Sequence, residues 1–259
     1  MDMRLKEKFI ELNGKYFNSA ALPITFYYSD TGQLADVVRP GTPSRCVVGA
    51  LVEVRNGHSV SFDADSIGCF GGRRYLGFDE ALRPDFEYFL SCGIPGKMEG
   101  ERYKKSPELV AETMKNWHRL RAPKPFIIFK IWDSLSQDDD PDVVIFFAQP
   151  DVLAGLFTLA NFDQSQLEGV ITPMGSGCSS LVAYPYLEKD SPHPRAVIGM
   201  FDPSARPYVP KGTLSFAVPM KMFVTMIENM EESFLGTRTW GKLRKRILPA
   251  RTIRSRKQI

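Results

Sequence analysis

Apolar side chains recur along this chain with two periods, one typical of helices and one typical of strands. A spacing of three to four residues predicts amphipathic helices over 4–17, 43–56, 84–92, 106–120, 149–161 and 219–234. Short runs rich in β-branched and aromatic residues predict strands over 23–30, 58–63, 125–132, 142–148, 169–172, 196–201 and 213–219. This mixture indicates an α+β fold, in which helices pack on a mixed sheet.

Two of these predictions leave an alternative open. The helix over 43–56 has a start signal in Thr42–Pro43 and a stop signal in Gly57, yet VVGALVEV within it also has the apolar content of a buried strand. The acidic stretch SQDDDPD separates the strands over 125–132 and 142–148. It predicts either a hairpin with a long loop or an excursion at the surface.

The two halves of the chain have a weakly similar order of elements. Each contains a short strand followed by a Gly–Cys turn, in VSFDADSIGCFGG and in VITPMGSGCSS. We therefore predict one globular domain over 1–236, built from half-units at about 15–100 and 124–235 that arose by internal duplication. Such a duplication would place Cys69 and Cys178 in comparable positions.

The composition is that of an ordinary folded protein, because 43% of the 259 residues are hydrophobic and 24% are charged. No apolar run reaches the roughly 18 to 20 residues of a transmembrane helix, and the first residues, MDMRLKEKFIELNGKYF, are charged where a signal peptide is apolar. We expect a cytoplasmic protein without a transmembrane segment. Its four cysteines are then expected to be reduced: Cys46, Cys69, Cys92 and Cys178.

Positive charge is concentrated at the C-terminal end. The formal net charge is +3, but residues 237–259 hold nine Lys or Arg residues and no acidic residue, which leaves about −6 on the rest. A basic extension of this kind either binds nucleic acid or acidic lipid or, more often, is solvated or docks on its own acidic body. Its only aromatic residue is Trp240, which is few for a protein that stacks single-stranded bases.

The stretch SIGCFGGRRYLGF (66–78) carries the strongest candidate chemistry. Glycines let backbone N–H groups turn inward to bind an anion, arginines add planar donors, and a thiol beside both is in the setting of a reactive cysteine. The alternative is a turn from strand to helix, in which the cysteine is a small buried apolar residue and the arginines are solvated. The motif is neither a P-loop nor a dinucleotide fingerprint. The residues concerned are Cys69, Gly71, Gly72, Arg73 and Arg74.

Two further segments could complete the same site. GSGCSS (175–180) would bind a phosphate or carboxylate if Ser179 opened a helix beside Cys178, although it also has the form of an ordinary Gly–Ser turn. In the loop FDPSARPYVPKG, Arg206 is a candidate anion ligand, unless it only pairs with Asp202 at the surface. We predict a site for a small anionic metabolite with Cys69 as its reactive thiol.

The sequence predicts no metal site and identifies no cofactor. It contains no CxxC pair and no HExxH motif, and its three histidines are isolated from one another. Convergence of the cysteines in space is the alternative that would allow a zinc ion or a cluster.

Taken in order along the chain, CFGGRRYLGF, PDVVIFFAQPDVLAGL and a late arginine before a strand that ends in Val–Pro resemble the uncharacterised prokaryotic domain-of-unknown-function family 169. The resemblance spans roughly 15–232 and implies a bacterial or archaeal cytosolic protein. It implies no activity. Two hypotheses follow: a protein or enzyme that binds a small anionic ligand, or a non-catalytic regulatory or scaffold protein that binds its partner through the basic C-terminal extension.

Overall fold

A mixed sheet forms the centre of the molecule, for which the computed structural model describes residues 1–32, 37–38 and 46–250. In these ranges the sheet has eight strands in the order β2-β3-β6-β1-β7-β10-β9-β8. The fold class is confirmed, and so is every strand that the sequence predicts. The bounds are β1 (Ile24–Ser29), β2 (Val37–Val38), β3 (Ser59–Phe62), β6 (Phe126–Ile131), β7 (Val143–Ala148), β8 (Val170–Ile171), β9 (Ala196–Gly199) and β10 (Leu214–Pro219).

The pairing of the strands corrects one prediction. β6 and β7 do not form a hairpin, because β1 lies between them and pairs antiparallel with both. As a central strand, β1 is buried on both faces, and Ile24, Thr25 and Phe26 are inaccessible to solvent. Apolar periodicity identifies a strand from its own residues, whereas the choice of partner depends on contacts far apart in the chain.

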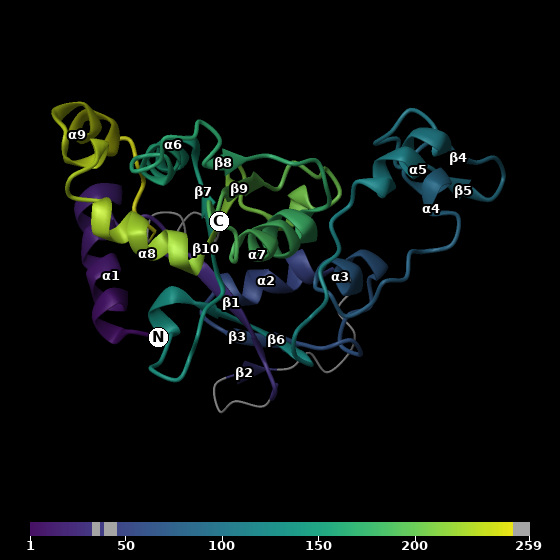
Figure 1. Cartoon of the computed structure of the whole chain (residues 1–259), viewed down its shortest axis with the longest axis horizontal. Coiled ribbons are helices and arrows are strands. Elements are labelled where there is room, and N and C mark those ends of the chain that lie inside the picture. Colours follow the sequence, from purple (N-terminus) through teal and green to yellow (C-terminus); the bar gives the residue numbers. More distant parts are fainter. Residues whose placement is uncertain (33–36, 39–45, 251–259) are drawn as a thin grey trace, which may run out of the picture.

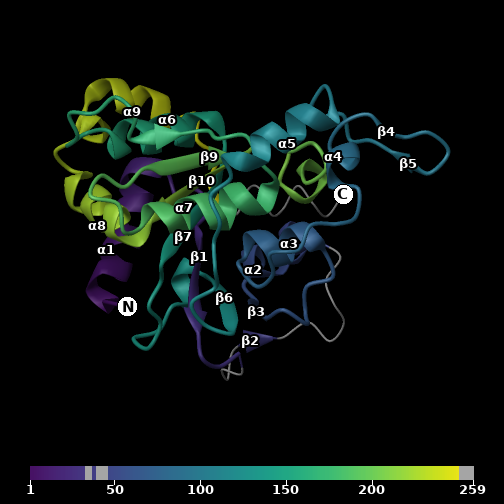
Figure 2. The ribbon, with the colours of Figure 1, turned by 45° about the vertical axis from the view of Figure 1, so that its right-hand side comes forward.

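Helices cover both faces of the sheet (Figures 1 and 2). On one face, α1 (Met3–Phe17), α6 (Pro150–Ala160), α8 (Met220–Asn229) and α9 (Arg238–Arg244) enclose a core that includes Phe146. On the other face lie α2 (Val47–Arg55), α3 (Phe70–Tyr75) and the continuous helical turns of η2 (Ser179–Ala183) and α7 (Tyr184–Glu188), around a core that includes Phe26. VVGALVEV therefore begins a helix and not a strand, while Thr42–Pro43 lies outside the described residues.

The two halves of the sheet have the same arrangement of strands when each is followed from its edge to the centre. β2 pairs parallel with β3, which is followed by β6 and β1; β8 pairs parallel with β9, which is followed by β10 and β7. In this correspondence β6 belongs to the first half, and the helix after Cys46 corresponds to the helix after Cys178. Cys46, and not Cys69, is thus the topological counterpart of Cys178. The duplication itself stays a prediction.

A small lobe, residues 79–121, projects from the sheet between α3 and β6 (Figures 1 and 2). We call it the cap. It contains α4 (Phe86–Phe89), a hairpin of β4 (Gly93–Ile94) and β5 (Met98–Glu99), and α5 (Pro107–Lys115). The helix predicted over 84–92 is therefore a single turn. α5 ends before residue 120, and beyond its end Trp117 packs between Tyr75 and Phe86.

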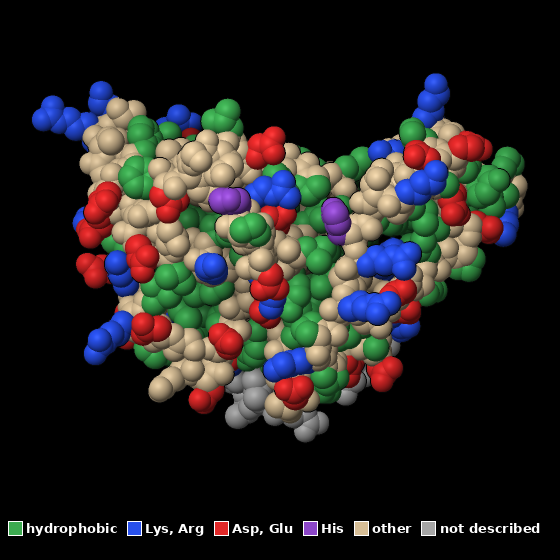
Figure 3. Space-filling model, in the orientation of Figure 1, with side chains coloured by type: hydrophobic (Ala, Val, Ile, Leu, Met, Phe, Trp, Pro, Cys, Tyr) green, Lys and Arg blue, Asp and Glu red, His purple; other side chains and the backbone are tan. Residues whose placement is uncertain are grey.

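The first part of the basic C-terminal segment docks on the body. Trp240 of α9 is 1% exposed, and its indole N–H donates to the Tyr16 carbonyl at 2.8 Å. Gly155 of α6 makes room for the ring, because a Cβ atom there would lie 2.4 Å from it. Arg246 pairs with Asp151 at 3.0 Å. Other Lys and Arg side chains at this corner project outward (Figure 3), and residues 251–259 lie outside the described part.

Candidate functional site

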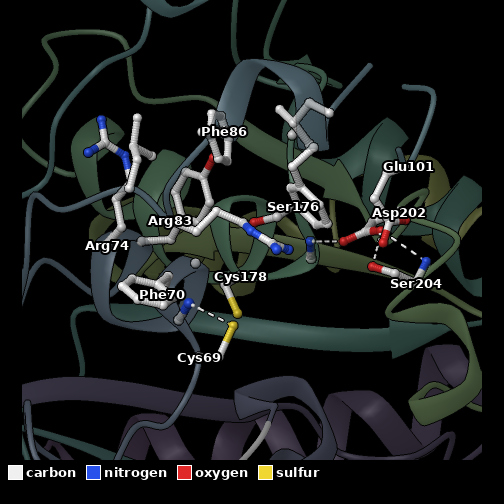
Figure 4. Close-up of a pocket in the computed structure, with 18 of the residues that line it drawn as sticks. Cys69, Phe70, Arg74, Arg83, Phe86, Glu101, Ser176, Cys178, Asp202 and Ser204 are labelled. Atoms are coloured by element: carbon white, nitrogen blue, oxygen red, sulfur yellow. Dashed lines mark hydrogen bonds between the residues drawn. The ribbon is translucent and has the colours of Figure 1, made fainter. Parts of the chain in front are cut away.

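A cavity of about 640 Å³ lies where the cap meets the body. Its floor comes from the segments that precede α2, α3 and η2, and its opposite wall comes from the cap. The loop after β9 closes one side through Asp202, Ser204 and Ala205. Figure 4 shows these side chains converging from separate elements. Figure 3 shows the cap as a lobe set apart from the body by a hollow at its upper edge.

Three cysteines line the floor of the cavity. Cys46 is the N-cap residue of α2, Cys69 is the N-cap residue of α3, and Cys178 directly precedes η2. The Cys69 sulfur accepts a hydrogen bond from the Gly72 N–H group at 3.4 Å, and it points toward the Cys178 sulfur (Figure 4). Cys92 is exposed on the cap and does not line the cavity.

The structure adds Cys46 to the thiols that the sequence singled out. The residues before Cys46 give a sequence signal for its position. Thr42–Pro43 precedes Cys46 and an apolar helix, as Thr172–Pro173 precedes Cys178. The shared Gly–Cys dipeptide favours an alignment of Cys69 with Cys178, whereas the strand order relates Cys178 to Cys46.

Cys178 is the most enclosed of the three thiols. Burial raises the pKa of its thiol well above the ordinary value, and the nearby Cys46 and Cys69 raise it further. A buried thiolate would lack hydration, so the neutral thiol is favoured. Cys46 and Cys69 are only partly buried and are therefore more accessible than Cys178.

The glycines of the motif act first through packing. A Cβ atom at Gly72 would lie 2.8 Å from Ile67 and 3.0 Å from Val47, so glycine lets the first turn of α3 approach α2 closely. Gly177 plays a similar part, because a Cβ atom there would lie 3.0 Å from the Ala205 side chain. These close approaches bring Cys69 and Cys178 to the same floor. At Gly71 an added Cβ atom would make only ordinary contacts.

The structure brings part of the predicted site together. Arg74 lines the cavity, donates to the Glu80 carbonyl at 2.5 Å and lies 5.7 Å from the Trp117 ring centroid. Arg73 does not line it, because its Nε donates to the Ile67 carbonyl at 2.6 Å. Of the predicted site residues, five line the cavity: Cys69, Gly71, Gly72, Arg74 and Cys178. Three do not line it: Arg73, Ser179 and Arg206.

Ser179 and Arg206 bind backbone carbonyls instead. The Ser179 hydroxyl donates to the Ser176 carbonyl at 2.7 Å and is inaccessible to solvent. The Arg206 guanidinium donates to the Thr213 carbonyl at 2.6 Å and more weakly to that of Met200, which fixes the loop between β9 and β10. Roles for Arg73, Ser179 and Arg206 in binding a ligand stay predictions.

The cap supplies two cations that sequence reasoning missed. Arg83 and Lys104 line the cavity, and the Arg83 guanidinium lies 3.9 Å from the Phe89 ring centroid. Across the described ranges, neither they nor Arg74 form an ion pair with a carboxylate. No sequence motif marks these positions, because Arg83 precedes a one-turn helix and Lys104 lies in a loop.

Aromatic rings form much of the remaining wall. Trp117 makes edge-to-face contacts with Phe86 at 5.6 Å and with Tyr75 at 6.4 Å between ring centroids. Burial raises the pKa of Tyr75 to about 12 although Arg74 opposes this, so its hydroxyl stays protonated at neutral pH. Phe70 and Met174 also line the cavity and are half-exposed, which gives it an apolar rim.

Asp202 links the cap to the floor. One carboxylate oxygen accepts the Tyr103 hydroxyl of the cap at 2.8 Å and the Ser204 hydroxyl at 2.7 Å, and the other accepts the Gly177 N–H group at 3.0 Å. Burial and the bond to Asp202 raise the pKa of Tyr103, which keeps it a donor. The Asp202–Arg206 ion pair considered from the sequence does not form.

The described residues hold neither a cluster of metal-binding side chains nor a membrane-spanning helix. They contain no group of three or more His, Cys, Asp or Glu side chains that could hold a metal ion. None of their helices is both long enough and apolar enough to cross a membrane.

Comparison with known protein families gives a match over most of the chain. The model of a family described as "Uncharacterised ArCR" matches residues 16–229, which include the whole sheet and the cap. Neither the curated proteins nor the solved structures contain a match.

Proposed function

Because this chain belongs to domain-of-unknown-function family 169, whose description names no activity, we propose a function from the site itself: the protein binds a small organic anion between cap and body. The observation that carries this proposal is the set of three cations, Arg74, Arg83 and Lys104, in the wall of one cavity without ion-pair partners among the described residues. Cations placed in this way favour a carboxylate or phosphate.

The size and lining of the cavity support the same class of ligand. Small-molecule sites enclose about 300–1,000 Å³ and combine apolar walls with few polar groups, and this cavity has about 640 Å³. Phe86 and Trp117 offer flat apolar surfaces to the body of the ligand, while Arg83 reaches its anionic group. Glu101 and Asp202 also line the cavity, and the Asp202 carboxylate already accepts hydrogen bonds from four donors, which belong to Tyr103, Gly177 and Ser204.

Binding of anilinonaphthalene sulfonate, an aromatic anion, tests the proposal. We expect one saturable site by fluorescence, and an Arg83→Ala variant that binds roughly tenfold more weakly or worse, because a hydrogen bond to a charged group is worth about 1.5–3 kcal/mol. Arg119→Ala is the matched control: Arg119 also lies on the cap, pairs with Glu80 at 3.3 Å and does not line the cavity. Equal affinities for the Arg83→Ala variant and the wild type would overturn the proposal.

Partner binding through the basic extension gains no support from the described residues. Trp240, the one aromatic residue in that segment, is buried against Tyr16 and Gly155 and is not available to stack on a base.

A further inference from the structure

Three thiols line the floor of the cavity, and binding of an anion by the cations in its wall gives none of them a role. They come from segments that are far apart in the sequence, and close packing at Gly72 and Gly177 holds two of those segments in place. Cys46 and Cys69 are near enough to Cys178 to act on its ionisation. Their grouping therefore comes from the tertiary structure and not from a local motif.

Two of the thiols are arranged as a pair. The Cys69 and Cys178 sulfur atoms point toward one another, and both residues are thiols in the structure (Figure 4). Both residues line the cavity, but Cys69 is only partly buried, while Cys178 is 8% exposed. Because Cys69 is the more exposed of the two, a molecule in the cavity meets Cys69 first, and the Cys178 sulfur faces the Cys69 sulfur.

We infer that Cys69 and Cys178 form a redox-active dithiol that reduces a small anionic organic disulfide bound in the cavity. The inference rests on the proposed function, because the anionic groups of the disulfide would be held by Arg74, Arg83 and Lys104. Its organic groups would lie against Phe86 and Trp117. An apolar cavity of this volume has room for such a ligand.

The exchange proceeds in two balanced steps. The Cys69 thiolate attacks one sulfur of the ligand, the ligand S–S bond breaks, and one ligand thiolate leaves and takes a proton from water. The hydroxide left by the first step takes the proton of Cys178, whose sulfur attacks the Cys69 sulfur, releases the second half of the ligand as a thiolate and forms the Cys69–Cys178 disulfide. The ligand disulfide gains two electrons and the protein dithiol loses them. A thiol reductant reverses the oxidation by the same exchange.

Dithiobis(nitrobenzoate), an aromatic dicarboxylate disulfide that releases a yellow thiolate, is a suitable probe. The experiment uses a Cys92→Ser background, because Cys92 is the exposed thiol outside the cavity. We expect about two equivalents of thiolate and a protein that has lost the mass of two hydrogen atoms without retaining an adduct. Peptide mapping should link Cys69 to Cys178. A link to Cys46, or stable adducts in place of a link, would overturn the inference.

Single variants test the order of attack. In the same background, Cys178→Ala should release about one equivalent and keep a nitrobenzoate adduct on Cys69, because the second thiol is missing. Cys69→Ser should lose the fast release, and Cys46→Ser should retain both the release and the link. Fast release in the Cys69→Ser variant would show that the first nucleophile is a different residue and would refute the assignment.

Arg83→Ala separates this inference from the proposed function. If the variant slows the reaction with the anionic probe at least tenfold but leaves that with neutral hydroxyethyl disulfide unchanged, both proposals are supported. If the variant reacts as the wild type does and the Cys69–Cys178 link still forms, the proposal of anion binding is refuted and the proposal of a redox-active dithiol is supported. If anilinonaphthalene sulfonate binds as expected and no link forms, the dithiol alone fails.

Discussion

At the scale of single residues, the most enclosed ion pair among the described residues lies away from the cavity. Lys130 of β6 and Asp139 are both 3% exposed by side chain, with Nζ and Oδ1 at 3.1 Å. Asp139 also accepts the Tyr27 hydroxyl and, at 2.7 Å, the Ser136 N–H group. The protein tolerates the burial of both charges because the oxygens of the Asp139 carboxylate also accept hydrogen bonds from Tyr27 and Ser136.

Replacing Lys130 tests how far this pair stabilises the fold. Lys130→Met leaves the Asp139 carboxylate buried without its cation, so we expect the free energy of unfolding in urea to fall by about 3–5 kcal/mol. Lys97→Met is the control, because Lys97 pairs with Asp85 at the surface of the cap. It should change the free energy by no more than about 1 kcal/mol. Equal effects of the two substitutions would contradict the prediction.

The same carboxylate predicts a dependence of stability on pH. Burial alone would raise the pKa of Asp139, but hydrogen bonds from Ser136, Tyr27 and Lys130 outweigh it and leave this pKa below its ordinary value. A carboxyl whose pKa is lowered in the folded state stabilises the fold above its unfolded pKa, about 3.9, and loses that contribution as pH falls through the folded value. Urea titrations should show this acid loss for the wild type, and a smaller loss for Asp139→Asn. Parallel pH profiles would refute this.

At the scale of elements, the sequence predicts those helices and strands whose formation depends on their own residues. Ser106–Pro107 begins α5, and VVGALVEV forms a helix whose apolar residues face the sheet. The position of β1 between β6 and β7 was not predictable, because the apolar content of a buried strand does not identify its neighbours. The residues of the site show the same contrast. The motif GCFGGRR allows Cys69 and Arg74 to be predicted from the sequence. Tertiary packing brings Cys46, Arg83 and Lys104 to the cavity, so no local motif predicts them.

The docking of α9 is an element-scale prediction of its own. Trp240→Ala removes a buried indole, and Gly155→Ala places a Cβ atom 2.4 Å from the same ring in the native arrangement. We expect either substitution to release the C-terminal segment, so that trypsin cleaves at its basic residues much faster than in the wild type. Binding of anilinonaphthalene sulfonate should persist, because Trp240 belongs to the core on the face of the sheet opposite α2 and α3. Unchanged cleavage in both variants would contradict the docking.

At the scale of the whole molecule, the cavity lies where the two halves of the sheet bring equivalent segments together. The helix after Cys46 follows β2 and the helix after Cys178 follows β8, and both N-termini reach the same floor. The connection from β3 to β6 carries Cys69 and the cap, while its counterpart from β9 to β10 carries Asp202. The two connections differ greatly in length, and the longer one supplies both Cys69 and the cap side of the cavity.

Tyr103→Phe tests whether the cap is held closed through Asp202. The substitution keeps the ring and removes only the hydroxyl that donates to Asp202 at 2.8 Å. Since one such bond contributes about 0.5–1.5 kcal/mol, binding of anilinonaphthalene sulfonate should weaken by roughly two- to tenfold. Hydrogen exchange should rise in residues 79–121 while the body stays protected, because the core of the body does not depend on this contact. Tyr88→Phe, at an exposed position on the cap, should change neither measurement; unchanged exchange in Tyr103→Phe would show that the cap is held by its aromatic contacts with Tyr75 and Arg74 instead.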